Sequence, residues 1–401
     1  EQKRRSLLQG DNRSEHFKQQ DFFLISGQPL AYALSHQAIA SFRNHPVIEE
    51  HINMKRGIST GNNEKYTRLW WEVDLNHTCF DAESRSQALH SKRRWFPHNR
   101  GGSYRKWYGC HDGVIDYEQG GQRMIADFES GASPGFRHDG KESYFLKGIT
   151  WSAFTSSKFS FRRLDPGFVL GHKGAGIYAQ GSLSDDFILG LLNSCVANYF
   201  LSSISPTLDV TMRQLLSIPL ISCDSENIRN IVRELVELFK TDWNTQETSW
   251  EFSAHPLTQM PHLSMRETLR SVDSERLAMW KQAQQLEESL NCTFTKAYSL
   301  DQIVDSEVKE EDITLLPNDD VTGIEGLISY SIGCMMGRYS LDEPGLIHAN
   351  SGNEGFDSSK YKTFPADDDG IVPITDFLWF DDDAAKRFED FIATAWPKEH
   401  L

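Results

Sequence analysis

Residues 91–108 read Ser-Lys-Arg-Arg-Trp-Phe-Pro-His-Asn-Arg-Gly-Gly-Ser-Tyr-Arg-Lys-Trp-Tyr, and no other stretch bears as directly on the fold. Cations alternate with aromatic side chains around a Gly-Gly pair. From Arg85 to Cys110 there are seven Lys or Arg and no Asp or Glu. Cations neutralise phosphates and planar rings stack on bases, so the pattern favours a nucleic-acid contact. A strand–loop–strand with exposed arginines and buried tryptophans would have the same composition.

The net charge of −16 is concentrated in one part of the chain. Residues 301–401 hold 23 Asp and Glu against 7 Lys and Arg, and the first 300 residues hold 34 of each. An acidic C-terminal domain is therefore joined to a body that is neutral as a whole and free to carry a basic surface. Aspartate runs at 367–369 and 381–383 could bind Mg²⁺ or Ca²⁺, but a solvated acidic face is the favoured interpretation.

Two further segments carry cations next to small polar residues. The loop Gly57–Asn63 is flanked by Lys55, Arg56, Lys65 and Arg68, which suits contacts with phosphates or base edges. It also reads as a capped helix start, with Thr60, Asn62 or Asn63 as the N-cap. Residues 158–163 alternate Phe with Lys, Ser and Arg, which predicts a strand with one wet, basic face.

Periodicity places helices and short strands along the chain. Strand and turn patterns dominate residues 75–222, where Gly-Gly pairs separate short apolar runs. Apolar residues at helical spacing then predict helices at 185–201, 225–243, 264–290, 324–337 and 381–396. No stretch of 18 apolar residues exists, so no membrane contact is expected. The first residues lack a signal peptide and an initiator Met, which indicates a start within a longer gene product.

The segments described above, together with several short motifs in a fixed order along the chain, resemble a known family. They are similar to the part that follows the catalytic domain in the BREX phage-defence adenine-specific DNA methyltransferases, the PglX family. The resemblance covers essentially all 401 residues. Segments 91–109 and 148–220 are also similar to target-recognition domains of TaqI-like adenine methyltransferases and their relatives. The motifs that carry the resemblance are Gly57–Asn63 with Arg68–Val73, Trp95–Gly109, Gly148–Ser152, Leu191–Ser194, Leu216–Leu220, Leu327–Tyr330 and Tyr361–Ala366.

The resemblance implies a whole protein that uses S-adenosylmethionine to methylate adenine N6 at a short asymmetric DNA site. It implies a cytoplasmic location, other BREX defence proteins as partners, and a phage DNA-mimic protein as an inhibitor of the same surface. It also implies an α+β fold. We expect a lead-in at 1–54, a mixed β-rich target-recognition domain at 55–222, a helical extension at 223–300 and an acidic α-rich C-terminal domain at 301–401.

The catalytic chemistry of such an enzyme has no match in this chain. Exocyclic-amine methylation needs an Asn/Asp-Pro-Pro-aromatic loop around a flipped base, and none of the 14 prolines is adjacent to another. The run Gly171–Gly176 is the only Gly-rich sequence that could hold a cofactor, and a hairpin turn is the favoured interpretation. The six cysteines lack metal or redox spacing. We therefore expect no cofactor, metal or catalytic residue here.

The prediction is that basic faces of the 55–222 domain bind double-stranded DNA. The predicted DNA contacts are Lys55, Thr60, Asn62, Asn63, Arg68, Arg94, Asn99, Arg100, Arg105, Lys106, Lys147, Thr150, Lys158, Arg162 and Lys173. The alternative is a protein–protein docking module for other BREX components, with 301–401 as its surface and little affinity for DNA. An acidic domain of that kind would recruit a basic partner.

Overall fold

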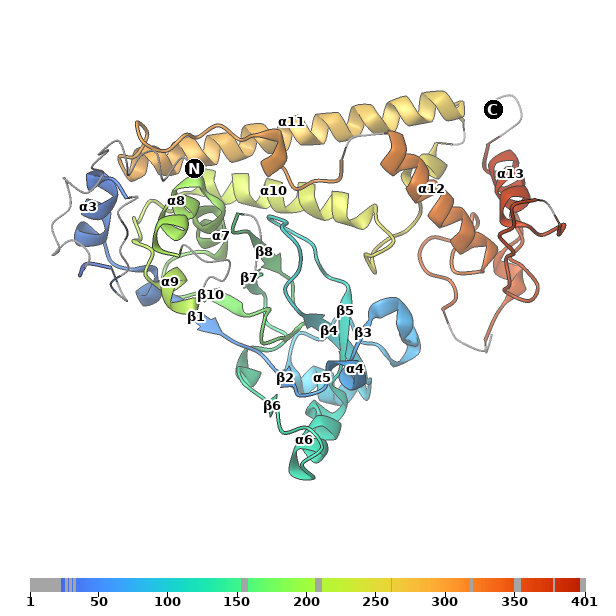
Figure 1. The fold of residues 1–401 in the computed structure, drawn as a ribbon, viewed down its shortest axis with the longest axis horizontal. Coiled ribbons are helices and arrows are strands. Elements are labelled where there is room, and N and C mark those ends of the chain that lie inside the picture. Colours follow the sequence, from blue (N-terminus) through green and yellow to red (C-terminus); the bar gives the residue numbers. More distant parts are fainter. Residues whose placement is uncertain are drawn as a thin grey trace, which may run out of the picture.

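The computed structural model describes residues 23–25, 28, 31, 34–152, 158–205, 211–260, 262–317, 320–349, 355–377 and 379–396 (Figure 1). The sequence also predicts a turn at Gly27–Pro29, where Gly27 and Pro29 lie outside these residues. Long helices run along one side of the molecule, small sheets project from them, and a helical C-terminal part lies at one end (Figure 1). The α+β class is confirmed.

Two four-stranded sheets form the β-rich part. One is antiparallel and has the order β1 (Ile52–Lys55), β10 (Gly176–Ala179), β7 (Gly148–Trp151), β8 (Phe161–Leu164). The other has the order β3 (Thr67–Leu69), β5 (Gly113–Asp116), β4 (Trp95–Asn99), β9 (Val169–Leu170), with β4 and β9 parallel. A short ribbon pairs β2 (Ser59–Thr60) with β6 (Phe136–Arg137). Short helices between the strands are α4 (Asn63–Tyr66), α5 (Arg85–Ser91) and α6 (Gln122–Glu129).

Strand β8 corrects the prediction of a wet, basic face. All four of its residues are buried, including Arg162 at 0% and Arg163 at 4% exposure. Helix α7 (Asp185–Asn193) packs against this strand. Strand β7 pairs with one edge of β8, and on the other edge the backbone of Trp107 forms a β-bridge with Arg162. Arg163 forms an ion pair with Asp186 of that helix. The alternation of Phe and Arg therefore reflects cations with partners inside the protein, not a solvated face.

Helix α7 packs on the first sheet, and α8 (Cys195–Ile204), α10 (Glu226–Asn244) and α11 (Met265–Ala297) pack behind it, on α7 and on one another. The predictions at 225–243 and 264–290 are confirmed, although α11 is longer than expected. The single helix predicted at 185–201 is instead two helices that meet at Ser194, whose hydroxyl caps α8 by accepting from Ala197 N at 3.2 Å. Smaller helices α3 (His36–Asn44) and α9 (Met212–Leu216) lie near β1 and α8.

Among the described residues, no single helix has the length and apolar character to cross a membrane. Helices α7 and α8 together pass such a test on length and composition, but they are bent by 63° at their junction. Every residue of α7 from Phe187 to Asn193 is buried, as are five residues of α8. These helices form the centre of the largest hydrophobic core, against β7, β8 and α10.

The C-terminal part packs around Tyr330, Tyr339 and Trp396, in a core that also includes Phe252, Leu257 and Val272 from the preceding chain. Its helices are α12 (Asp320–Met335) and α13 (Ala384–Ala395). The helix predicted at 381–396 begins three residues later because Asp383 is its N-cap and accepts from Ala385 N at 3.0 Å. The cap satisfies a backbone donor that has no partner within the helix.

Two buried ion pairs join the β-rich part to the helices. Arg105 reaches Asp242 of α10 at 2.8 Å, and Lys106 reaches Glu287 of α11. Arg105 also donates to the Phe239 carbonyl at 3.0 Å, and Glu287 accepts from the Trp107 indole at 2.7 Å. We call this group the buried clamp. Its charged groups are at most 8% exposed, so each needs its partner to remain charged inside the protein.

Replacing Asp242 by Ala is expected to lower the free energy of unfolding by about 3–5 kcal/mol, because Arg105 would stay buried without its carboxylate. Denaturant unfolding followed by circular dichroism measures the change. The matched control is Glu226→Gln at the other end of α10, where the carboxylate is 62% exposed and the expected change is below about 1 kcal/mol. Equal effects of the two substitutions would contradict a role for burial.

A buried histidine makes the fold sensitive to acid. His111 is 2% exposed, lies among Tyr108, Phe168 and Trp250, and neither ring nitrogen has a hydrogen-bond partner among the described residues. Burial, followed by the charge of Arg162, lowers the pKa of His111 from 6.5 to about 3. The folded protein therefore keeps this ring neutral where the unfolded chain would protonate it.

The free energy of unfolding is expected to fall as pH drops below about 6.5, because His111 is then protonated in the unfolded chain but stays neutral in the folded protein. The loss from His111 is about 1.4 kcal/mol for each pH unit down to its folded pKa. Burial also lowers the pKa values of His98 and His255 to about 4, which adds to the effect. His111→Phe should flatten the curve between pH 7 and 5 in urea unfolding. An unchanged slope would show that this ring is protonated in the fold.

Candidate nucleic-acid interface

Four basic side chains come together where β1, the β2–β6 ribbon and the turn between β9 and β10 meet. They are Arg56, Arg137, His172 and Lys173, and we call them the tip cluster. Backbone pairing assembles it from three distant segments: Arg137 is opposite Ser59 in the β2–β6 ribbon, and His172 N donates to the Ile58 carbonyl at 2.9 Å. No short sequence motif contains these residues together.

The electrostatics of the tip cluster are those of an anion-binding surface. Arg56, Arg137 and Lys173 are exposed, and His172 is half-buried. Desolvation, followed by the charges of Arg56, Arg137 and Lys173, lowers the pKa of His172 below its ordinary 6.5. Asp139 opposes this shift and lies 4.0 Å from Arg137. Lys173 forms no ion pair with a carboxylate of the described residues, so positive charge exceeds negative charge here.

Glycines allow the backbones beneath the tip cluster to touch. A Cβ at Gly57 would lie 1.9 Å from the Leu170 carbonyl oxygen, and one at Gly174 would lie 2.2 Å from that of Asn99. Such distances exclude any side chain. The run Gly171–Gly176 is a turn, as favoured, but it links β9 and β10 of different sheets and closes no hairpin. It leads into a strand, without the helix that a dinucleotide-binding loop opens.

The structure places six of the predicted contact residues in the interior: Thr60, Asn99, Arg105, Lys106, Thr150 and Arg162. The Asn99 amide donates to Thr150 Oγ1 at 2.6 Å and to the Gly174 carbonyl at 2.9 Å. Thr150 Oγ1 in turn donates to the Ala175 carbonyl at 2.9 Å. Arg162 binds the carbonyls of Ser103 and Arg105. Because their polar groups already bind this chain, we leave these six residues out of the proposed interface.

The other predicted residues reach solvent to differing degrees. Asn62 is the N-cap of α4 and accepts from Lys65 N at 3.0 Å, while Asn63 accepts from Thr60 Oγ1 at 2.6 Å. Arg68 donates to main-chain carbonyls of Glu64 and Thr67. Lys147 and Lys173 are exposed. The cations that form ion pairs are Lys55 with Glu142, Arg94 with Asp116, Arg100 with Asp112 and Lys158 with Asp312.

Sequence reasoning missed part of the tip cluster. Arg56 was noted only as a flanking residue, and Arg137 and His172 had no distinguishing signal. Arg137 belongs to a two-residue strand, which is too short for periodicity to reveal. Only the pairing of β2 with β6 brings it to Arg56 and Lys173.

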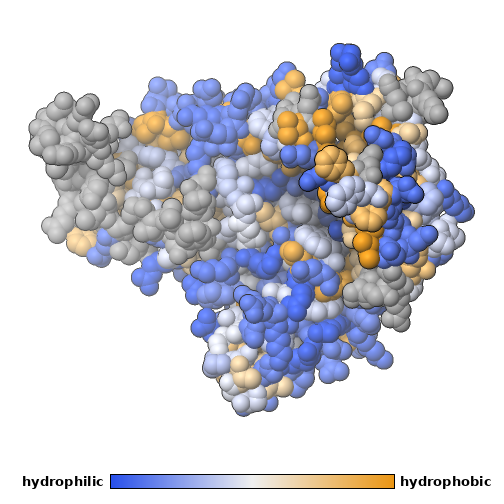
Figure 2. Space-filling view, turned by 45° about the vertical axis from the view of Figure 1, so that its right-hand side comes forward, coloured by the Kyte–Doolittle hydropathy of each residue, from blue (hydrophilic) through white to orange (hydrophobic). Residues whose placement is uncertain are grey.

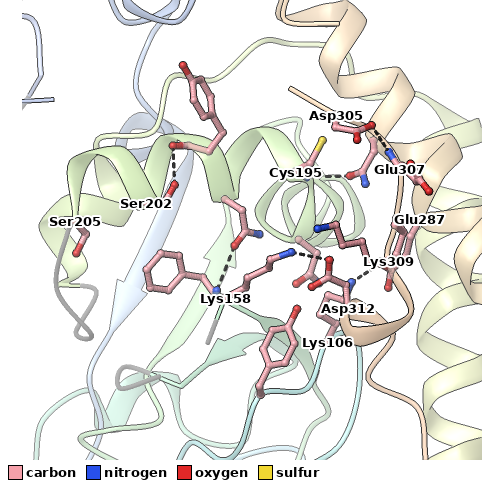
Figure 3. Close-up of a pocket in the computed structure, with 17 residues that line it drawn as sticks. Lys106, Lys158, Cys195, Ser202, Ser205, Glu287, Asp305, Glu307, Lys309 and Asp312 are labelled. Atoms are coloured by element: carbon pink, nitrogen blue, oxygen red, sulfur yellow. Dashed lines mark hydrogen bonds and ion pairs between the residues drawn. The ribbon is translucent and has the colours of Figure 1, made fainter. Parts of the chain in front are cut away.

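A pocket of about 580 Å³ lies elsewhere, between α8, α11, residues 158–159 and the segment 305–312 (Figure 3). Its charges are mixed, and two ion pairs lie among them: Lys158 meets Asp312 at 2.6 Å, and Lys106 meets Glu287. Asn198 accepts from Phe159 N at 3.2 Å. No group of three or more His, Cys, Asp or Glu among the described residues is arranged to hold a metal ion. With three lysines and four carboxylates in its lining, the pocket lacks the surplus of positive charge that a phosphate contact needs.

Comparison with known proteins identifies relatives of the same kind as the motifs predicted. The adenine-specific methyltransferase BrxX of Escherichia coli O9:H4 (strain HS) is 33% identical over 423 residues, which cover 100% of this chain and 34% of BrxX. The adenine-specific methyltransferase PglX of Lacticaseibacillus casei (strain Zhang) is 33% identical over 402 residues, covering 96% of this chain and 32% of PglX. No protein-family model matches the chain.

The chain spans about a third of the length of these two relatives. It is homologous, over essentially all of its own length, to a part of the BREX adenine-specific methyltransferases, and the predicted resemblance is confirmed.

Anion binding at the tip cluster is expected to depend on pH through His172. Burial, followed by the charges of Arg56, Arg137 and Lys173, lowers the pKa of this ring from its ordinary 6.5 in the free protein. A bound phosphate would raise that pKa, so binding should take up a proton and strengthen as pH falls. DNA affinity is expected to increase from pH 7.5 to 5.5, and His172→Gln should remove most of the increase. An identical pH profile for the variant would exclude His172 from the contact.

Proposed function

We propose that this chain is the DNA-recognising part of an adenine-N6 DNA methyltransferase of a BREX defence system. The tip cluster carries the proposal: it is a surface with unneutralised positive charge on the part whose motifs resemble target-recognition domains. Cations on such a surface neutralise phosphates and release counterions, which supplies affinity for any duplex. Phosphate contacts also fix the orientation in which base edges are then read.

The neighbouring loop Gly57–Asn63 is the proposed source of base contacts. It joins Arg56 of the tip cluster to α4, and Asn62 and Asn63 are exposed on it. An amide side chain can pair with adenine in the major groove through one donor and one acceptor. The Oδ1 of Asn62 accepts the hydrogen bond of the helix cap. Its Nδ2 takes no part in that bond and is the atom proposed to donate to a base.

Methyl transfer belongs, in this proposal, to the remainder of a longer protein that uses S-adenosylmethionine. BrxX and PglX carry the name methyltransferase, and about two thirds of each lies beyond the region that matches this chain. Double-stranded DNA and other BREX proteins are the proposed partners. A cytoplasmic location accords with six cysteines that are all free.

The test is fluorescence anisotropy with random duplex DNA from about 50 to 200 mM salt, the range in which phosphate-binding proteins lose most affinity. The variant Arg56→Ala/Arg137→Ala/Lys173→Ala is expected to bind more weakly. Its log–log salt slope should shrink by about 0.9 for each phosphate contact that is lost.

The matched control removes three exposed cations from α11, as Arg266→Ala/Arg270→Ala/Lys281→Ala. It changes the net charge equally but lies on the long helix, away from the tip cluster (Figure 1). Retained affinity and slope in this control, with loss in the tip variant, would support the proposal. Equal losses would mean that only overall charge matters, and no DNA binding by the unaltered chain would refute it.

A further inference from the structure

The C-terminal part displays an apolar surface that its own core does not use. Between Asp367 and Asp383 the chain forms a loop that we call the acidic–aromatic loop. Five large apolar side chains on it are mostly solvent-exposed: Ile371 67%, Ile374 82%, Phe377 71%, Trp379 74% and Phe380 52%. Figure 2 shows hydrophobic residues gathered over the C-terminal end of the molecule, whereas hydrophilic residues dominate the β-rich part below.

The loop is anchored to the domain at both of its ends. Asp367 N donates to the Met335 carbonyl at 2.7 Å, which fixes the first end against α12. At the other end, Asp383 accepts from Thr375 N at 3.1 Å while it also caps α13. Ala384 N donates to the Pro373 carbonyl at 2.8 Å. The exposed rings are therefore displayed from a pinned loop, so binding would cost less conformational entropy than from a free tail.

The charge around these apolar residues has one sign. Residues 367–383 contain seven aspartates and no Lys, Arg or His. Asp368, Asp369, Asp376 and Asp381 are exposed beside the apolar side chains. Exposed apolar patches with a polar rim mark interaction sites, and aromatic residues dominate their binding energy. A rim of carboxylates selects a partner with the opposite charge and repels DNA, anionic lipids and the same loop of a second copy.

We propose that the acidic–aromatic loop is a docking site for a basic amphipathic segment of a partner protein. That segment would insert apolar side chains between Phe377, Trp379 and Ile374, and its Lys or Arg residues would pair with the surrounding aspartates. The site is independent of the tip cluster and of the proposed DNA recognition, since it lies in the C-terminal part and has the opposite charge.

The test uses the full chain and two fluorescein-labelled amphipathic peptides of about 18 residues, long enough to become helical on binding. One peptide places Leu on one face and Lys on the other, and the second replaces every Lys by Glu. The Lys peptide should bind with an affinity that falls with salt, and the Glu peptide should not bind. Phe377→Ser/Trp379→Ser should weaken binding at least about tenfold, a loss typical of aromatic interface residues.

Matched controls separate docking from folding and from general stickiness. Leu89→Ser/Leu277→Ser removes two exposed apolar residues elsewhere, which are 49% and 45% exposed, and should leave peptide binding unchanged. Asp368→Asn/Asp376→Asn/Asp381→Asn should reduce binding and its salt dependence with the apolar residues intact. DNA affinity should be the same in all of these variants, so a failure of docking is distinguishable from a failure of DNA recognition.

Other outcomes would overturn the proposal. Equal binding of the Glu peptide, or full binding by Phe377→Ser/Trp379→Ser, would exclude a basic partner at this loop. A reversible dimer in sedimentation velocity that disappears in that variant would identify a second copy as the occupant. Binding to phosphatidylcholine vesicles that disappears in the same variant would identify a membrane surface instead.

Discussion

The buried clamp is the interaction on which the rest of this structure depends. Arg105 and Lys106 carry two charges into the contact between the β-rich part and helices α10 and α11, where Asp242 and Glu287 receive them. Removing such charges from water costs several kcal/mol each, which is recovered only when every partner is in place. The pairs therefore specify one arrangement of sheet and helices more than they add stability. The backbone that follows is held in unusual conformations, with φ of +65° at Trp107 and +61° at Cys110.

The basic residues of the 55–222 region fall into two groups, those buried in or near the clamp and those exposed at the surface. Cations at positions 105, 106, 162 and 163 have their partners within the protein and serve the fold. Those of the tip cluster lie outside this contact, on the surface, where exposed charge remains for a ligand. The acidic–aromatic loop adds a third surface with the opposite sign. DNA and a basic protein segment would thus bind to different surfaces of one molecule, which suits a component that links DNA recognition to an assembly.

The sequence predicted the helices better than the site. Helices α10 and α11 have long apolar periodicity and clear caps at Ser225 and Ser264, so local information suffices. Segment 91–108 was ambiguous because composition alone cannot tell a buried cation from an exposed one. The partners of Arg105 and Lys106 are 137 and 181 positions away along the chain. The tip cluster likewise depends on long-range strand pairing, and the helix break at Ser194 depends on one capping hydroxyl inside an apolar run.

Hydrogen–deuterium exchange of the chain with and without a duplex tests most directly whether the tip cluster, and not the 91–108 segment as a whole, contacts DNA. Added DNA is expected to slow exchange at 56–61, 136–141 and 171–174, the backbone that carries the tip cluster. Exchange at 105–110 and in α12 and α13 should stay unchanged. Protection centred on 105–110 or on the C-terminal helices, with none at the tip cluster, would contradict this division of the basic residues.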